Sequence, residues 1–89
     1  SKIFLTDPQT GLNYPGDEQT VTNVNIHLSF LLLKRKGFSF CFKLLRENAA
    51  LIRTIKELQN EGYNENLLDY MKKLHQNIIW LGVLADQKQ

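Results

Sequence analysis

The 89-residue sequence has one cysteine and two histidines, and this scarcity argues against two common ways of holding a small protein together. Cys41 has no partner for an intramolecular disulfide, and with His27 and His75 it makes too small a ligand set for a structural zinc site. Domains of this size usually need a staple, a metal or a partner to fold well. We therefore expect the additional buried surface to come from another protein.

Long apolar runs and a strong charge bias are also missing. The two longest nonpolar runs, at 28–33 and 78–85, fall well short of the roughly 18 to 20 residues that a membrane-spanning helix needs. Charged residues and prolines occupy the first 20 positions, where a signal peptide would have its apolar core, so we expect an intracellular protein. A formal net charge of +2 is too small to predict a nucleic-acid-binding face.

The only charge run is Lys34-Arg35-Lys36, which precedes Gly37. We interpret it as a solvated loop, with a minimal nuclear-import signal as the alternative. No catalytic pattern is recognisable: there is no nucleophile with a base, no paired carboxylates and no phosphate-cradling glycine loop. We therefore predict that the protein is not an enzyme and that it has no catalytic residues, no cofactor and no metal.

The first 38 residues differ in composition from the rest. Residues 1–25 combine prolines and glycines with Asn, Gln and Thr and show no sustained periodicity, which predicts loop or disorder. Residues 26–33 are either a short strand or one turn of helix, because periodicity cannot separate these for so short a run. We expect 1–38 to be a largely irregular or disordered N-terminal segment and 39–87 to be the folded domain.

Two apolar stripes with helical spacing follow residue 39. Both recur every three or four positions, the spacing of helices that pack on each other, and Gly62 separates them where a left-handed helix cap is expected. The sequence therefore predicts an all-α fold, an antiparallel two-helix hairpin of about residues 40–61 and 64–87. The expected hairpin seam consists of Leu44, Asn48, Leu51, Ile55 and Leu58 from the first helix and Leu67, Met71, Leu74, Asn77, Ile78, Leu81 and Ala85 from the second.

The two stripes are in register with each other. Facing positions of an antiparallel hairpin have a nearly constant sum of residue numbers, and the leucines of both stripes satisfy this rule when the chain turns near Gly62. The same register places Asn48 opposite Asn77. Their amides either hydrogen-bond to each other and fix the alignment, as a polar seam residue does in coiled coils, or each reaches water.

The second helix carries more apolar surface than the seam uses. A helix that is apolar on nearly all sides is buried on more than one of them. A buried strand from Ile78 to Leu84 is the rival interpretation, which β-branched and aromatic content favours and the unbroken seam disfavours. The predicted partner-binding residues are Ile52, His75, Ile79, Trp80, Val83 and Leu84.

The run from Leu44 to Asp86 resembles the SSXT domain, the N-terminal homology region of the synovial-sarcoma translocation protein and of the plant coactivators that bind growth-regulating factors. The sequence departs from the family pattern at Tyr63, Asn66, Leu67, Trp80 and Gly82, has Cys41 and Phe42 where an Ile-Gln pair is usual, and matches nothing familiar in residues 1–38. The positions that follow the pattern are Leu45, Glu47, Asn48, Leu51, Ile52, Ile55, Gln59, Asn60, Gly62, Tyr70, Leu74, His75, Asn77, Leu81, Ala85 and Asp86.

This resemblance implies a non-enzymatic transcriptional coactivator and chromatin-remodelling subunit. Its hairpin is expected to dock, in the nucleus, onto a Brahma-type remodelling ATPase or a transcription factor, without direct contact with nucleic acid or membrane. The alternative from another class is a self-associating module, in which two hairpins bury Trp80 and its neighbours in a four-helix bundle.

Overall fold

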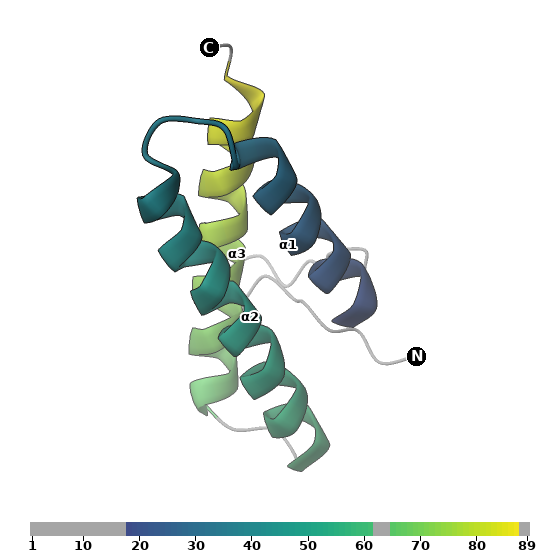
Figure 1. Cartoon of the computed structure of the whole chain (residues 1–89). Coiled ribbons are helices and arrows are strands. Elements are labelled where there is room, and N and C mark those ends of the chain that lie inside the picture. Colours follow the sequence, from purple (N-terminus) through teal and green to yellow (C-terminus); the bar gives the residue numbers. More distant parts are fainter. Residues whose placement is uncertain (1–17, 62–64, 88–89) are drawn as a thin grey trace.

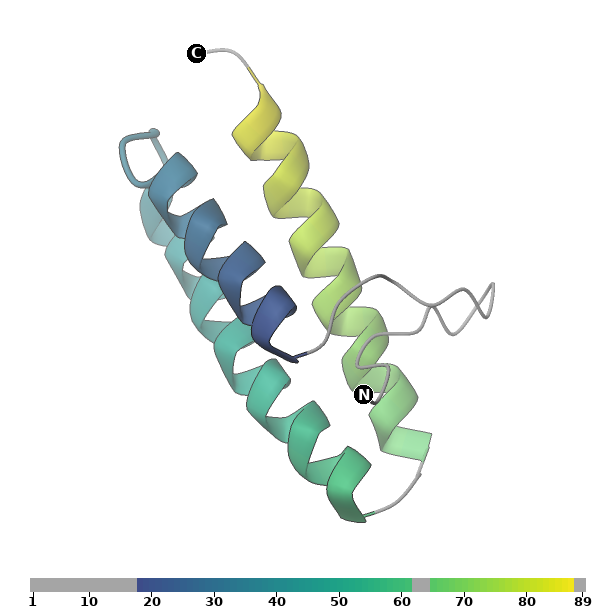
Figure 2. The same ribbon diagram turned by 90° about the vertical axis from the view of Figure 1, so that its right-hand side faces the viewer.

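The computed structural model describes residues 18–61 and 65–87, which form three α-helices packed along one another. Helix α1 spans Glu18–Leu32, α2 spans Phe38–Glu61 and α3 spans Glu65–Asp86. Helices α2 and α3 run antiparallel, and α1 lies against both, beside the N-terminal half of α2 and the C-terminal half of α3 (Figures 1 and 2). The fold is therefore a three-helix bundle.

The all-α class is correct, but the two-helix hairpin preceded by an irregular segment is wrong. Residues 18–32, which the sequence assigned to loop and to a strand or single turn, form α1 and contact both other helices. Val21, Asn25, Leu28 and Leu32 are the buried residues of α1, and their spacing of 4, 3 and 4 is that of a helix seam. Exposed apolar residues on the other faces and an asparagine within the stripe obscured this periodicity. Residues 1–17 lie outside the described part of the chain.

The two helices of the predicted hairpin are present. The predicted helix at 40–61 is α2, and the predicted helix at 64–87 is α3. The rival strand from Ile78 to Leu84 is wrong, because α3 continues through this segment to Asp86. The expected cap at Gly62 lies outside the described residues.

The core consists of two clusters of buried side chains, one toward each end of the bundle. All three helices contribute to both clusters, so α1 is part of the core at its two ends. The first cluster contains Val21, Leu51, Ile52, Ile55, Leu67, Met71 and Leu74. The second contains Leu28, Leu32, Cys41, Leu45 and Leu81.

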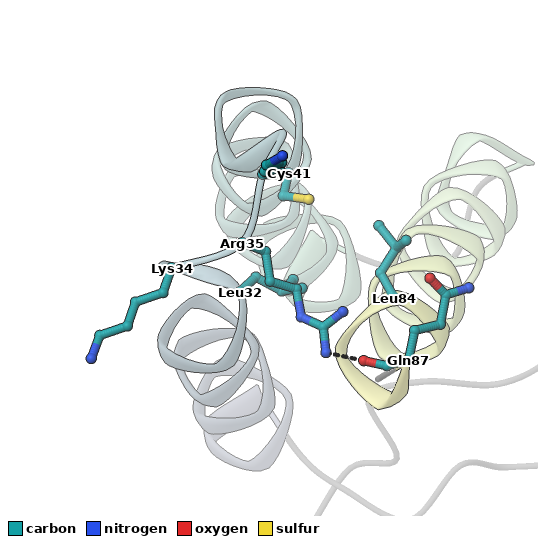
Figure 3. Close-up of a pocket in the computed structure, with 7 residues that line it drawn as sticks. Leu32, Lys34, Arg35, Cys41, Leu84 and Gln87 are labelled. Carbon is teal, nitrogen blue, oxygen red and sulfur yellow. Dashed lines mark hydrogen bonds between the residues drawn. The ribbon is translucent and has the colours of Figure 1, made fainter. Parts of the chain in front are cut away.

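The turn between α1 and α2 is tied to the C-terminal end of α3. The Arg35 guanidinium donates to the carbonyl oxygen of Ala85 at 3.1 Å and to that of Gln87, so it satisfies carbonyls that a helix end leaves unpaired (Figure 3). Lys34 is exposed and points away from this contact. Gly37 has a φ of +80° and lies directly before α2, and its carbonyl oxygen accepts the first α2 hydrogen bonds, from the N–H groups of Phe40 and Cys41.

Between the two core clusters, three buried asparagines form a hydrogen-bonded chain across the three helices. Asn77 Nδ2 donates to Asn48 Oδ1 at 3.0 Å, which is the pairing that the register of the two stripes predicted. Asn48 Nδ2 donates to Asn25 Oδ1 at 3.0 Å, and Asn25 Nδ2 donates to the Leu45 carbonyl oxygen at 3.0 Å. We call these three residues the asparagine ladder. It contains one side chain from each helix.

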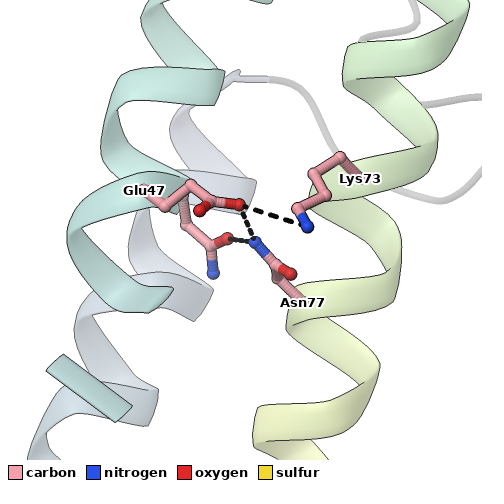
Figure 4. Close-up of polar contacts among 4 residues, drawn as sticks. Glu47, Lys73 and Asn77 are labelled. Atoms are coloured by element: carbon pink, nitrogen blue, oxygen red, sulfur yellow. Dashed lines mark hydrogen bonds and ion pairs between the residues drawn. The ribbon is translucent and has the colours of Figure 1, made fainter. Parts of the chain in front are cut away.

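The outer end of the ladder reaches a charged pair. The second proton of Asn77 Nδ2 points to Glu47 Oε1 at 2.9 Å, and the same oxygen lies 3.9 Å from Lys73 Nζ (Figure 4). Asn48 is completely buried and therefore depends on its two asparagine neighbours for hydrogen bonds. An unpaired amide there would cost about 1–3 kcal/mol, so the three helices are aligned by the need to keep the ladder complete.

We predict that the ladder members are energetically coupled. Asn25→Ala and Asn48→Ala should each lower the free energy of unfolding by about 1–3 kcal/mol, because each removes a partner from a buried amide. The double variant should lose less than the sum of the two, by at least about 0.5 kcal/mol. Urea unfolding of the four proteins measures the coupling. Asn23→Ala, at an exposed position of the same helix, is the matched control and should change stability by less than about 0.5 kcal/mol. Strict additivity would contradict the ladder.

Two glycines offer a second prediction, because a Cβ added at either one would meet no atom within 4 Å. Gly82 lies within α3, so Gly82→Ala should raise stability by about 0.5–1 kcal/mol through better helix propensity. Gly37→Ala should instead lower it by about 1–2 kcal/mol, because its positive φ strains any residue with a Cβ. Thermal unfolding followed by circular dichroism measures both. Changes of the same sign would show that backbone conformation does not govern these positions.

Candidate protein-docking surface

An exposed apolar surface forms where the start of α2 passes the C-terminal half of α3. The rings of Phe40 and Trp80 meet edge to face, with centroids 5.4 Å apart and an interplanar angle of 76°. Phe40 is 57% exposed and Trp80 is 42% exposed. Ile79 and Val83 are also exposed, and both are within one helical turn of Trp80 on α3. We call Phe40, Ile79, Trp80 and Val83 the α2–α3 surface.

The helix geometry explains why these side chains stay outside. The core stripe of α3 uses Leu74, Asn77 and Leu81, and α1 covers the side of α2 that faces away from Phe40. No helix within the described ranges therefore lies over Phe40 and Trp80. Contiguous exposed aromatic and β-branched side chains of this kind mark interaction sites more often than ordinary protein surface.

The structure places the six predicted partner-binding residues in three different environments. Ile79, Trp80 and Val83 share the α2–α3 surface. His75 and Leu84 are partly buried, and Leu84 packs against the second core cluster. Ile52 is only 4% exposed and belongs to the first cluster, so in this fold it does not reach the surface. Ile79, Trp80 and Val83 thus remain together as a candidate site, while Ile52 does not join them.

The predicted seam residues all lie in or against the core. Asn48 and Asn77 supply two of the three ladder amides. The buried members are Asn48, Leu51, Ile55, Leu67, Met71, Leu74, Asn77 and Leu81, and those partly buried against the clusters are Leu44, Leu58, Ile78 and Ala85.

Phe40 is the member of this surface that the sequence did not predict. It lies before the first apolar stripe, in a Phe-Ser-Phe-Cys-Phe run whose faces cannot be separated without knowing that two helices pack on α2. A helical projection of residues 38–61 would have placed Phe40 on the same side as Leu44, which is the signal available in the sequence.

A cavity of about 530 Å³ lies at the same end of the bundle, beside the α1–α2 turn. Arg35, Cys41 and Leu84 line it, together with Leu32 and Gln87 (Figure 3). The Cys41 thiol is free and buried. Because Arg35 also binds the last carbonyls of α3, this cavity is part of the contact that holds the turn against α3.

The described part of the chain offers no metal site. Within residues 18–61 and 65–87, no group of three or more His, Cys, Asp or Glu side chains is placed to hold an ion. None of the helices in these ranges combines the length and the apolar character needed to cross a membrane.

Comparison with known proteins identifies related sequences for α2 and α3. The chain is 46% identical over 44 residues to the synovial-sarcoma-translocation-like protein 2 of Homo sapiens, a match that covers 49% of this chain and 57% of that protein. The Mus musculus protein of the same name matches to the same extent. The Calcium-responsive transactivator of Homo sapiens is 38% identical over 47 residues, which are 53% of this chain and 12% of that protein.

These matches therefore span a little over half of the first two relatives and a small part of the transactivator. No solved structure matches the chain significantly. The family profile described as SSXT protein (N-terminal region) matches residues 41–89, which include nearly all of α2 and the whole of α3 but not α1. Because this match covers more than half of the sequence, the chain belongs to the SSXT family.

Proposed function

We propose that this chain is a non-enzymatic transcriptional coactivator module that works by docking onto a protein partner through the α2–α3 surface. Two kinds of evidence support the proposal. The chain belongs to the SSXT family, and one relative carries the name Calcium-responsive transactivator. The helices that carry the surface are also those that the family match covers.

The single observation that carries the docking role is the Phe40–Trp80 pair. Tryptophan is the residue most enriched among interface hot spots, and here it is held in a fixed orientation by an edge-to-face contact with an aromatic ring of another helix. Ile79 and Val83 extend the apolar area along α3. A rigid aromatic anchor loses little side-chain entropy on binding, so such a surface is suited to a tight contact.

The charged groups near this surface favour a defined orientation of the partner. Glu47 and Lys73 form a pair between α2 and α3 at 3.9 Å, and both side chains are about half exposed. A polar rim beside an apolar centre is the usual anatomy of a protein interface. We propose that Phe40, Ile79, Trp80 and Val83 form that centre.

The partner that we propose, on the resemblance to the SSXT domain, is a Brahma-type chromatin-remodelling ATPase subunit or a transcription factor. The site of action would then be the nucleus. Self-association through the same surface is the competing function, because two copies could bury Trp80 against each other in a symmetric contact. The size of the purified chain in solution separates the two functions.

We predict that neighbouring positions of α3 fail in different ways. Trp80→Ala should leave the helix content nearly unchanged and weaken partner binding by about 2 kcal/mol or more, as expected for an aromatic hot spot. Leu81→Ala should instead lower the free energy of unfolding by about 2–5 kcal/mol, because Leu81 is fully buried. Circular dichroism and a binding titration with a purified remodelling-ATPase fragment measure the two effects.

Val24→Ala is the matched control, because Val24 on α1 is 40% exposed, close to the value for Trp80. It should change neither helix content nor affinity. If Trp80→Ala unfolds the chain as severely as Leu81→Ala while binding survives, Trp80 is a core residue and the docking surface is misassigned. A dimer that Trp80→Ala dissociates would identify self-association as the function of this surface.

A further inference from the structure

A second exposed apolar region lies on the opposite side of α2, between α2 and α1. It is a groove of about 370 Å³ lined mainly by apolar side chains, among them Phe30, Leu33, Phe38 and Phe42. Phe30 is 72% exposed, the largest value among the exposed large apolar residues of the described chain. The rings of Phe38 and Phe42 are 5.8 Å apart. We call Phe30, Leu33, Phe38, Phe42 and the adjoining Arg46 the aromatic groove.

The aromatic groove is separate from the α2–α3 surface. Residues two positions apart on a helix point in directions about 200° apart, so Phe42 faces α1 while Phe40 meets Trp80 on α3. Lys43, Glu47 and Ala50 line a shallow polar depression of α2 together with Arg46 and Arg53, at the edge of the groove. A partner bound at one region would therefore leave the other accessible.

The groove has a positively charged rim. The Arg46 guanidinium carbon lies 5.8 Å from the centroid of the Phe42 ring, which fixes one cation at the edge of the apolar lining. Lys43 and Arg53 follow on the same outer side of α2, and the exposed Lys34 and Lys36 lie in the turn that joins α1 to α2.

The nearby acidic residues do not neutralise this rim. Glu18 pairs with Lys56 at 3.2 Å, and Glu47 pairs with Lys73 on the α3 side. Among residues 18–61 and 65–87, no carboxylate forms an ion pair with Lys43, Arg46 or Arg53. An apolar interior with an uncompensated basic edge is complementary to a ligand that has apolar side chains on one face and carboxylates beside them.

We propose that the aromatic groove binds an acidic amphipathic peptide segment of a partner protein. The apolar side chains of the segment would enter between α1 and α2 and contact Phe30, Leu33 and Phe42, while its Asp and Glu side chains would meet Arg46 and the neighbouring lysines. A concave groove of this volume accepts side chains at helical spacing, which is the usual way an amphipathic helix is recognised.

This inference goes beyond the proposed coactivator function. Three of the four apolar side chains of the groove, Phe30, Leu33 and Phe38, precede the first residue of the family match. The groove is thus largely built from the part of this chain that the match does not cover.

A peptide-binding experiment on the full chain tests the proposal. The probe is a fluorescent peptide of about four helical turns, with Leu and Phe along one face and Glu on the others. The matched peptide has Lys at every Glu position. The acidic peptide should bind at least about tenfold more tightly than the basic one at low salt, and its affinity should fall as salt is added.

Two variants locate the site, and one is a control. Phe42→Gln and Arg46→Glu change exposed positions of α2 and should keep the helix content, and each should weaken binding of the acidic peptide at least about tenfold. Trp80→Ala alters the other surface and should leave peptide affinity within about twofold. Binding of the remodelling-ATPase fragment should show the reverse sensitivity, so failure of one proposal can be told from failure of the other.

Several results would overturn the inference. Equal affinity for the acidic and basic peptides would remove the role of the basic rim, and unchanged affinity in both Phe42→Gln and Arg46→Glu would remove the groove. Loss of peptide binding in Trp80→Ala would move the peptide to the α2–α3 surface. Phe42-dependent binding to vesicles of anionic phospholipid without peptide binding would identify a membrane as the ligand. A dimer that Phe42→Gln dissociates would identify a second copy of the chain as the occupant.

Discussion

The asparagine ladder is the constraint that sets the arrangement of the three helices. Asn48 is enclosed and can be satisfied only if α1 brings Asn25 to one side and α3 brings Asn77 to the other. Apolar contacts alone tolerate sliding of one helix along another, because leucine packs almost equally well against several neighbours. A buried amide does not tolerate it, because a shifted register leaves donors and acceptors unpaired in an apolar surrounding.

The ladder therefore supplies alignment more than stability. A hydrogen bond between two amides contributes only about 1 kcal/mol net, whereas a missing partner is costly. The apolar clusters on either side of the ladder provide the burial, and the ladder determines which residues face each other. One consequence is that Phe40 and Trp80 come to the same height of the bundle, where their rings meet.

The third helix changes which surfaces are left for partners. By covering Leu45 and Ile52, α1 removes one side of α2 from solvent and confines the exposed apolar residues to two separate regions. The α2–α3 surface belongs to helices within the family match, whereas the aromatic groove exists only because α1 is in place. Its outward apolar residues also explain why α1 does not resemble an ordinary amphipathic helix in the sequence.

The amino-acid sequence was sufficient to predict the all-α class, the positions of α2 and α3 and their register. These features follow from local periodicity and from arithmetic between two stripes, so they need no knowledge of a third element. The sequence also indicated that Ile79, Trp80 and Val83 lie outside the seam, because helix geometry alone fixes the direction of each side chain. For the candidate site, this was the part that could be predicted.

The existence of α1, the burial of Ile52 and the meeting of Phe40 with Trp80 depend on the packing of all three helices. An asparagine within an apolar stripe looks like a polar interruption until the amides of Asn48 and Asn77 are known to face it. Ile52 similarly looks outward-facing until a third helix covers it. In each case the contact that matters joins residues on different helices, and local sequence patterns carry no information about such long-range pairs.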